Sequence, residues 1–470
     1  MASATGEAVR FTRPAVAWAI EGVGCPARGQ RANSRFLNFG ALKRHGQGEA
    51  RYMILSHTVH ENSLKDPSAM PDEAIKTRNP VARISPKNSG VRSDALDFLR
   101  GVAALYVVVN HTRGAFFKGG NAILSDAGSS ALSLADYAAL AVLQLTSLGT
   151  EFVILFFCLS GIAMAHSMAL APHPLHFYKK RIIRIWPPYL LAVGVAVATC
   201  YGMNFINPES VLSKECAPKL CDFHEIVRMA FYIDPSSSLT AQFWSLPHEV
   251  IFYLLCPIIL CSKSMIKSTA LLSLFFSVLG AIFLGININP SPSLLVNFAT
   301  NSLAWFMCGV LAYHYFEFIP RLNTAWLGML LAALFVRPWA LKRLVGDSNA
   351  FSSAIMVAFT LMAVRNLPRS LTSLSFLNWG SFSYSIYLFH FAVIGLISFM
   401  LMEQWGVRRQ EMHSYFLWII FLPPILLACR LLYLCAEKPC NDYLTRMRDR
   451  ERSLSRAGSD QAASLGRQSP

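Results

Sequence analysis

Apolar stretches separated by short polar connections fill the chain from about residue 96 onward. About ten of them approach the roughly 20 apolar residues that a helix needs to cross a hydrocarbon core. Two are weaker, because 322–340 ends in Arg337-Pro338 and 350–365 is short. The pattern predicts an all-α fold, a polytopic membrane helix bundle of about ten transmembrane helices. The predicted spans are residues 96–113, 138–168, 188–206, 243–262, 268–286, 295–317, 322–340, 350–365, 376–402 and 412–436.

Polar, basic segments flank this apolar region at both ends. Residues 1–90 are rich in Ala, Gly, Ser, Pro and Arg and hold no helical or strand period, so we expect a disordered N-terminal tail. Met53 and Met70 are alternative starts, since nothing before Met70 has a structural pattern. Residues 446–470 are expected to form a disordered basic C-terminal tail. The membrane domain is therefore predicted at 91–445.

Composition and charge agree with a membrane protein. The chain is 54% hydrophobic and 15% charged, whereas soluble domains carry about 25% charged residues. The net charge of +15 does not indicate a nucleic-acid partner, because the basic residues lie in short connections and in the tails rather than on one amphipathic surface. We therefore expect a lipid bilayer as the surrounding medium and no nucleic acid as a partner.

The basic connections predict an orientation. With a cytoplasmic N-terminus, the connections around Lys179–Arg184, Ser262–Lys267 and Val364–Arg369 and the basic C-terminal tail face the cytoplasm, while 207–242 faces outward. Both termini are then cytoplasmic. Two pairs of basic residues do not fit this arrangement, namely Lys342-Arg343 and Arg408-Arg409.

The cysteines and histidines show no metal-ligand spacing, so we expect no metal. Most cysteines in the apolar spans are interpreted as small hydrophobes. Cys216 and Cys221 share the polar connection 207–242, and a disulfide between them is open if that connection faces an oxidising compartment.

The stretch Leu96–Thr112 places charged and titratable side chains in an apolar helix. Arg100 and His111 are eleven positions apart, so at ~100° and 1.5 Å per residue they share one face and lie ~16 Å apart along the axis. Asp97 lies on nearly the same face as Arg100. Such groups are costly in a membrane and usually face the bundle interior or a water-filled cavity. This helix is therefore the first candidate site.

Two further stretches hold polar groups with both a structural and a functional interpretation. Ser160 and Gly161 permit close helix packing, and packing alone explains them. Arg181 and Arg184 share one face of an interfacial helix that Pro187-Pro188 is expected to stop. They fit either an ordinary positive-inside connection or a clamp for a polyphosphate ligand such as coenzyme A.

Three more groups lie toward the end of the chain or at the start of a span. Glu249 begins a span on the predicted outer side and is either a solvated interfacial carboxylate or functional. Tyr384, Tyr387 and His390 lie inside an apolar span, where a hydrogen-bonded core histidine is the simpler interpretation. Glu437, after the last span, is expected to be an end cap or an ion-pair partner.

In order and spacing, these stretches resemble the acyltransferase-3 family of integral membrane acyltransferases over about residues 95–440. The first resembles the family's opening signature, an Arg and a His with ten residues between them, at Arg100 and His111. The other four resemble its FFxLSG, RxxRIxPxY, WSLxxExxFYLL and SYxxYLxH segments, at 156–161, 181–189, 244–255 and 383–390. Each motif alone is weak, whereas five in order are specific. Phe98 and Pro247-His248 depart from the family pattern, and the long N-terminal tail has no counterpart in it.

The resemblance implies an O-acyltransferase of the bacterial inner membrane. It implies transfer of an acyl group, usually acetyl, from cytoplasmic acyl-CoA to a hydroxyl of a sugar, glycan or other acceptor. His111 is then the base, Glu249 orients it or stabilises its imidazolium, and Arg100 holds a CoA phosphate or organises the cavity. Arg181 and Arg184 would bind CoA phosphates. The further candidates are Asp97, Ser160, Tyr384 and His390.

Two other classes of protein remain open at this point. A transporter or flippase for a lipid-linked or polar solute would use the buried charges as a translocation path, although no internal repeat is visible. A non-catalytic membrane scaffold explains the buried titratable groups less well. The acceptor, the acyl chain, and direct transfer as against an acyl-enzyme intermediate are left open by the sequence.

Overall fold

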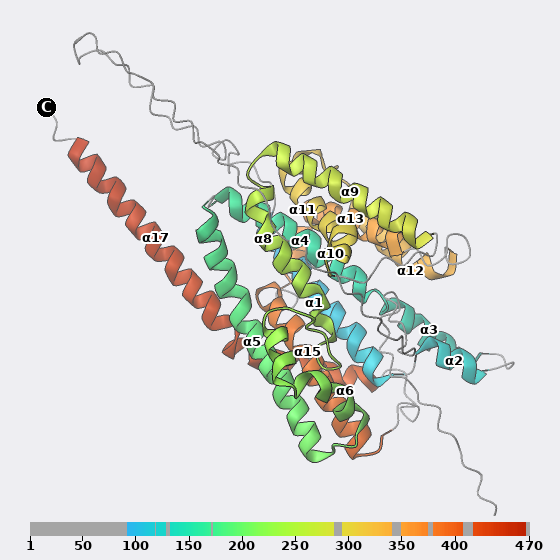
Figure 1. The fold of residues 1–470 in the computed structure, drawn as a ribbon. Coiled ribbons are helices and arrows are strands. Elements are labelled where there is room, and N and C mark those ends of the chain that lie inside the picture. The colour runs from blue at the N-terminus through green and yellow to red at the C-terminus, as the bar shows by residue number, and fades with distance from the viewer. Residues whose placement is uncertain are drawn as a thin grey trace, which may run out of the picture. The chain divides into compact units, whose positions relative to one another are not determined.

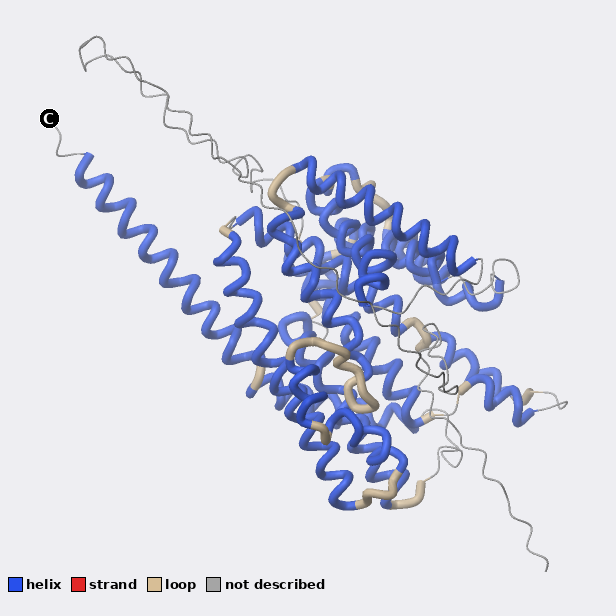
Figure 2. Tube along the Cα trace, in the orientation of Figure 1, coloured by secondary structure: helices blue, strands red, loops and turns tan. Residues whose placement is uncertain are grey.

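The computed structural model describes residues 92–117, 119–127, 132–170, 173–285, 294–340, 349–374, 379–407 and 417–466. These residues belong to one structural unit, and a second unit, Ile20–Asn79, lies outside the described part, as does the whole predicted N-terminal tail. The described residues form helices and no strand (Figure 2). The predicted all-α fold is therefore confirmed for this part of the chain.

The α-helices are α1 (Ser93–Phe116), α2 (Gly120–Ala127), α3 (Leu134–Leu145), α4 (Gly149–Leu170), α5 (Pro174–Ile206), α6 (Val211–Leu220), α7 (Phe223–Ala230), α8 (Leu246–Ile259), α9 (Lys263–Gly285), α10 (Leu294–Asn297), α11 (Leu303–His314), α12 (Thr324–Ala340), α13 (Asn349–Asn366), α14 (Arg369–Thr372), α15 (Ser383–Ser398), α16 (Leu422–Cys435) and α17 (Glu437–Gly466).

Each of the ten predicted spans overlaps a helix, but five helical segments are long and apolar enough to cross a membrane within the described ranges. The two spans that the sequence marks as weak coincide with shorter apolar helices, Thr324–Phe335 and Ser352–Asn366. The count of about ten crossings thus stays a prediction. The five segments are Leu134–Leu170, Pro174–Ile206, Leu294–His314, Trp379–Gln404 and Trp418–Cys435.

Helix α1, which carries Arg100 and His111, packs against α4 and α15 (Figure 1). Its small and branched residues Ala103, Ala104, Val107 and Val108 are buried at these contacts. Val107 and Val108 follow Ala103 and Ala104 by one helical turn, so the four residues form one apolar stripe. The packing places α1 between the two helices that contribute Ser160 and His390.

Two glycines let α4 and α11 approach backbone to backbone. A Cβ atom added to Gly161 would lie 2.1 Å from the carbonyl oxygen of Phe306, and one added to Gly309 would lie 2.0 Å from the carbonyl oxygen of Cys158. Small residues at a helix contact are the usual means of close approach in membranes. The close packing that the sequence predicts at Ser160-Gly161 is confirmed.

Helix α5 differs from the prediction, because it runs unbroken through Pro187-Pro188. Prolines remove two backbone donors, and a helix in a bundle tolerates this where neighbouring elements hold the chain. Here the Tyr384 hydroxyl of α15 donates to the Ile185 carbonyl at 3.1 Å. The Trp186 indole donates to the Ala230 carbonyl, also at 3.1 Å. The predicted interfacial helix and the predicted span are therefore one helix of 33 residues.

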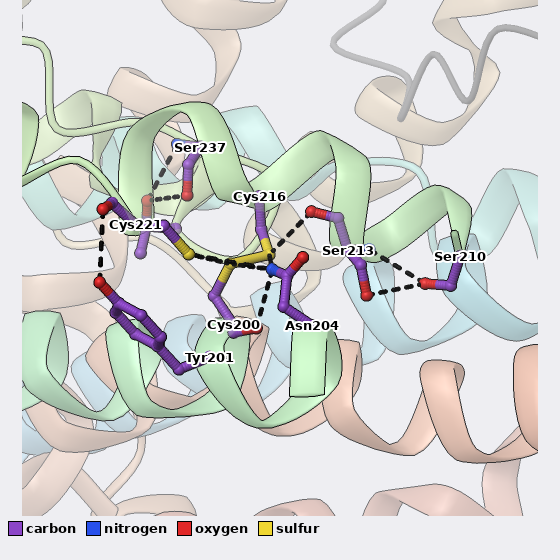
Figure 3. Close-up of a disulfide and its surroundings, with 9 residues drawn as sticks. Cys200, Tyr201, Asn204, Ser210, Ser213, Cys216, Cys221 and Ser237 are labelled. Atoms are coloured by element: carbon purple, nitrogen blue, oxygen red, sulfur yellow. Dashed lines mark hydrogen bonds between the residues drawn. A yellow bond between two sulfur atoms is a disulfide. The ribbon is translucent and has the colours of Figure 1, made fainter. Parts of the chain in front are cut away.

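A disulfide joins α5 to α6, but with a partner other than the one considered from the sequence. It links Cys200 and Cys216, while Cys221 stays a thiol (Figure 3). The reason is local: residues 211–220 form a helix that turns Cys216 toward α5, and Cys221 follows at its C-terminal cap. The Cys221 Sγ lies 3.8 Å from the Cys200 Sγ.

The C-terminal segment also differs from the prediction. Residues 446–466, expected to be disordered, continue α17 from Glu437 to Gly466. This sequence holds five Arg, three Ala and two Leu, which have high helix propensity. Contacts with α5 add to this, since Glu451 lies 3.5 Å from His176 and 3.8 Å from Lys180. Figure 1 shows α17 beside α5.

Candidate active site

The first charged group of the site stands on the first half of α1. The Arg100 guanidinium lies 3.6 Å from the Asp97 carboxylate, one helical turn away. Gly380, which precedes α15, packs on the same turn: a Cβ atom there would lie 2.1 Å from the Asp97 carbonyl oxygen. The backbone of residue 380 therefore fixes the position of Asp97 and Arg100 relative to the start of α15.

Helix α5 brings two more guanidiniums to this end of α1. Arg100, Arg181 and Arg184 interact electrostatically with one another, although they come from helices far apart in the sequence. The Arg181 Cζ lies 5.5 Å from the ring centre of Phe177 and 5.6 Å from that of Tyr253, within cation–π range. We call Arg100, Arg181 and Arg184 the arginine cluster. Guanidiniums bind anionic groups such as phosphates, and here the carboxylates of Asp97, Glu249 and Glu437 balance part of the positive charge.

The Glu249 carboxylate stands close to this cluster at the start of α8. Its Oε1 accepts a hydrogen bond from the Ser160 hydroxyl of α4 at 3.2 Å, and another from the Tyr253 hydroxyl one turn along α8. Glu249 also interacts electrostatically with Arg100. The sequence placed Glu249 on the outer side, where it would pair with His111; the structure instead places it beside the arginine cluster, and its hydrogen-bond partners in the described part of the chain are Ser160 and Tyr253. Tyr253, which sequence reasoning missed, stands four positions after Glu249, a spacing that places both on one helix face.

His111 lies near the other end of α1 and faces α15. Its ring centre is 5.4 Å from that of His390, with 28° between the planes, and 4.6 Å from that of Phe391. His111 is partly exposed, whereas His390 is fully buried. The structure thus brings His390 to the candidate base.

His390 is anchored through one ring nitrogen. Its Nδ1 lies 2.9 Å from the Ile386 carbonyl oxygen, which only accepts, so Nδ1 carries the hydrogen. Its Nε2 is buried and has no partner in the described part of the chain. The interpretation of His390 as a hydrogen-bonded core histidine is confirmed for Nδ1, but it does not account for Nε2.

The tyrosines of α15 hold this helix in register with its neighbours. The Tyr387 hydroxyl donates to the Gln242 carbonyl at 2.7 Å and shares a hydrogen bond with the Ser245 hydroxyl at 2.6 Å. The Gln242 side chain in turn donates to the Leu388 carbonyl at 2.8 Å. Tyr384, as described above, reaches α5. Tyr384 and Tyr387 therefore position the helix that carries His390.

A buried carboxylate ties α17 to the start of α15. The Oε2 of Glu437 accepts hydrogen bonds from the Ser385 amide at 3.0 Å and from the Ser385 hydroxyl at 2.7 Å. Burial raises the pKa of Glu437, and the hydrogen bonds from Ser385 oppose this rise. Arg184 is an electrostatic neighbour of this carboxylate. Glu437 is thus a capping residue for α15, next to the arginine cluster.

Taken together, the described residues form a helical membrane bundle with an arginine cluster near one end of α1 and an imidazole pair near the other. The chain belongs to the acyltransferase-3 family, because that family's model, described as an acyltransferase domain, matches residues 93–434. It is a membrane acyltransferase.

Two curated proteins are similar to this chain. Nodulation protein 10 of Rhizobium leguminosarum bv. viciae is 25% identical over 268 residues, which is 52% of this chain and 71% of that protein. Acyltransferase MdmB of Streptomyces mycarofaciens is 24% identical over 345 residues, which is 66% of this chain and 85% of that protein. No solved structure matches the chain significantly.

Proposed function

We propose that the protein is an O-acyltransferase that moves an acyl group, acetyl in the first instance, from cytoplasmic acyl-CoA to a hydroxyl of a sugar or glycan. The observation that carries this proposal is the arginine cluster, Arg100, Arg181 and Arg184, in a chain of the acyltransferase-3 family. Guanidiniums bind phosphate oxygens through paired, charge-assisted hydrogen bonds. The 3′-phosphate and diphosphate of CoA match such a cluster.

His111 is the group we assign as base. Its neutral imidazole takes the proton from the acceptor hydroxyl while the hydroxyl oxygen forms a bond to the thioester carbonyl carbon. The carbon–sulfur bond then breaks, and the CoA thiolate takes the proton back from the His111 imidazolium. The partial exposure of His111 supports this role, since an acceptor must reach the ring.

Helix α1 links donor binding to chemistry. Arg100 and His111 are eleven positions apart on one helix, hence ~16 Å along its axis. A CoA whose phosphates are held at the arginine cluster can extend its pantetheine arm along α1 and present the thioester near His111. Asp97 and Glu249 balance the charge of Arg100 in this arrangement, and Ser160 and Tyr253 hold Glu249.

The disulfide supports the proposed orientation in a bacterial inner membrane. Disulfides persist in oxidising compartments, and Cys200 stands near the C-terminal end of α5, whereas Lys179 and Lys180 stand near its start. With the basic end in the cytoplasm, the Cys200–Cys216 pair lies on the outer side. Both termini of the chain are then cytoplasmic.

The test uses the full-length protein in nanodiscs with isotope-labelled acetyl-CoA. We expect wild-type protein to bind acetyl-CoA and, in cells that express it, to add acetyl groups to surface glycans, measured by mass spectrometry. His111→Ala should abolish acetylation and keep donor binding. Arg181→Ala with Arg184→Ala should weaken donor binding, whereas Lys219→Ala, in the predicted outer connection, should not.

Two results would remove the proposal. Full acetylation by His111→Ala would exclude His111 as the base. Unchanged donor affinity of the double arginine variant would exclude the clamp. Transport of a solute by proteoliposomes, with no acyl transfer, would favour the transporter alternative instead.

A further inference from the structure

We propose that His390 is a positioning residue that holds the His111 ring and stabilises its protonated form through the face of a neutral imidazole. The proposal rests on the proposed function, in which His111 is the base. It gives His390 the part that the family resemblance implied for Glu249, whose hydrogen-bond partners in the described part of the chain are Ser160 and Tyr253.

The rings of His111 and His390 stack on each other. Their centres are 5.4 Å apart and their planes differ by 28°, so the rings stack face to face with an offset. A cation within about 6 Å of an aromatic ring centre is attracted to the face of that ring. When His111 takes a proton, its imidazolium therefore has an aromatic face next to it. Phe391 supplies a second, tilted ring 4.6 Å away.

His390 has a fixed tautomer and is uncharged. The Ile386 carbonyl accepts from Nδ1 at 2.9 Å, which fixes the tautomer with the hydrogen on Nδ1 and a lone pair on Nε2. The side chain is 0% exposed, and Nε2 has no partner among the described side chains and backbone groups. A buried charge without a partner is costly, so the neutral ring is favoured. A neutral ring attracts the His111 imidazolium, whereas a protonated one would repel it.

His111 and His390 differ in their access to the acceptor. His111 is partly exposed and His390 is fully buried, so an acceptor hydroxyl meets His111 and not His390. The proton passes from the acceptor oxygen to His111 and from there to the CoA sulfur, and it does not visit His390. His390 therefore acts through His111.

The anchoring of α15 supports a fixed position for His390. Tyr387 is bonded to Gln242 and Ser245, and Glu437 caps the helix at Ser385. A helix held at these points keeps the ring of His390 in place while His111 gains and loses its proton. Preorganised groups of this kind contribute to catalysis because they need no rearrangement during the reaction.

Three variants separate the ring face from the Nδ1 hydrogen bond. His390→Phe keeps an aromatic face and loses both nitrogens, His390→Asn keeps a donor for the Ile386 carbonyl and loses the ring, and His390→Ala loses both. We expect His390→Ala and His390→Asn to lower kcat roughly 5- to 30-fold, the range of a partly desolvated cation–π contact. His390→Phe should keep kcat within about threefold, because Phe also attracts a cation to its face. The KM for acetyl-CoA should stay unchanged in all three.

The outcomes are distinct from those of the proposed function. If wild-type protein transfers acetyl groups and His111→Ala does not, the His390 series alone decides this inference. It is overturned if His390→Asn matches wild type, or if His390→Phe is as slow as His390→Ala while acetyl-CoA binding shows that both are folded. Diethyl pyrocarbonate gives an independent check: it should modify His111 before His390 in native protein, and the reverse order would contradict the assigned roles.

Discussion

The Ser160 hydroxyl on α4 lies 3.2 Å from the Glu249 carboxylate on α8 and donates a hydrogen bond to it. The neighbouring residue, Gly161, faces the α11 backbone instead. Two adjacent residues of α4 thus have separate tasks, one polar and one steric. Substitutions at the two positions should therefore have different consequences.

Ser160→Ala should lower activity more than stability. A hydrogen bond to a charged group contributes about 1.5–3 kcal/mol, and Glu249 keeps Tyr253 as a partner, so we expect a roughly tenfold loss of kcat/KM and a small change in Tm. Acetyl transfer and thermal unfolding in nanodiscs measure the two effects. A clear fall in Tm with normal activity would indicate a packing role only.

Gly161→Ala and Gly309→Ala should destabilise the fold. The added Cβ atoms would lie 2.1 and 2.0 Å from backbone oxygens, which forces α4 and α11 apart. Overpacking of this kind costs typically 1–3 kcal/mol, and contact with backbone rather than a flexible side chain places these sites at the upper end. Gly194→Ala on α5 is the matched control, because a Cβ there meets nothing within 4 Å. Equal Tm values for Gly161→Ala and Gly194→Ala would contradict the described contact.

Cys216→Ser should lead to a new disulfide between Cys200 and Cys221. The Cys221 Sγ lies 3.8 Å from the Cys200 Sγ, and the Asn204 amide lies within 4.0 Å of all three sulfurs (Figure 3). Peptide mapping by mass spectrometry under non-reducing conditions should find the Cys200–Cys221 link in membrane-inserted protein whose connection 207–242 faces an oxidising compartment. Cys261→Ser, which changes an exposed free cysteine, should leave the Cys200–Cys216 link in place. Free Cys200 and Cys221 in the Cys216→Ser protein would count against this geometry.

Glu437→Gln should gain stability over wild type as the pH rises. Burial raises the pKa of Glu437 above its ordinary value of 4.5. The folded state then binds this proton more tightly than the unfolded state. The free energy of unfolding of the wild type therefore falls as the pH rises through the pKa that Glu437 has in the folded protein. The amide of Gln still accepts from Ser385 but carries no charge. Tm measured from pH 5 to 8 should show a growing advantage of Glu437→Gln over wild type, and a difference independent of pH would exclude this explanation.

Much of the helical architecture could be predicted from the pattern of apolar and charged residues within single stretches of the sequence. The apolar stretches coincide with helices, and one continuous α1 carries Arg100 and His111 as predicted from their spacing. The arginines of α5 were also singled out, because their spacing of three places them on one face. In each case the decisive information lies within one helix.

Contacts between distant elements were not predictable in this way. The stacking of His111 on His390 and the bond from Ser160 to Glu249 depend on how α1, α4, α8 and α15 pack, which no helical period encodes. Tyr253 lies in the segment that resembles WSLxxExxFYLL, but it was not singled out because an aromatic residue in an apolar span is usually a packing residue. The disulfide partner was missed because Cys200 lies in a span, where a cysteine is usually a small hydrophobe.

Helix α17 follows α16 after the single residue Ala436 and continues for 30 residues, ~45 Å at 1.5 Å per residue. The contact of Glu451 with His176 and its ion pair with Lys180 hold α17 against α5. A fluorescent reporter joined after Gly466 would consequently be attached to a continuous helix rather than to a flexible linker. Energy transfer between this reporter and a dye in the bilayer would then respond to tilting of α5 as well as to the distance of the reporter from the membrane.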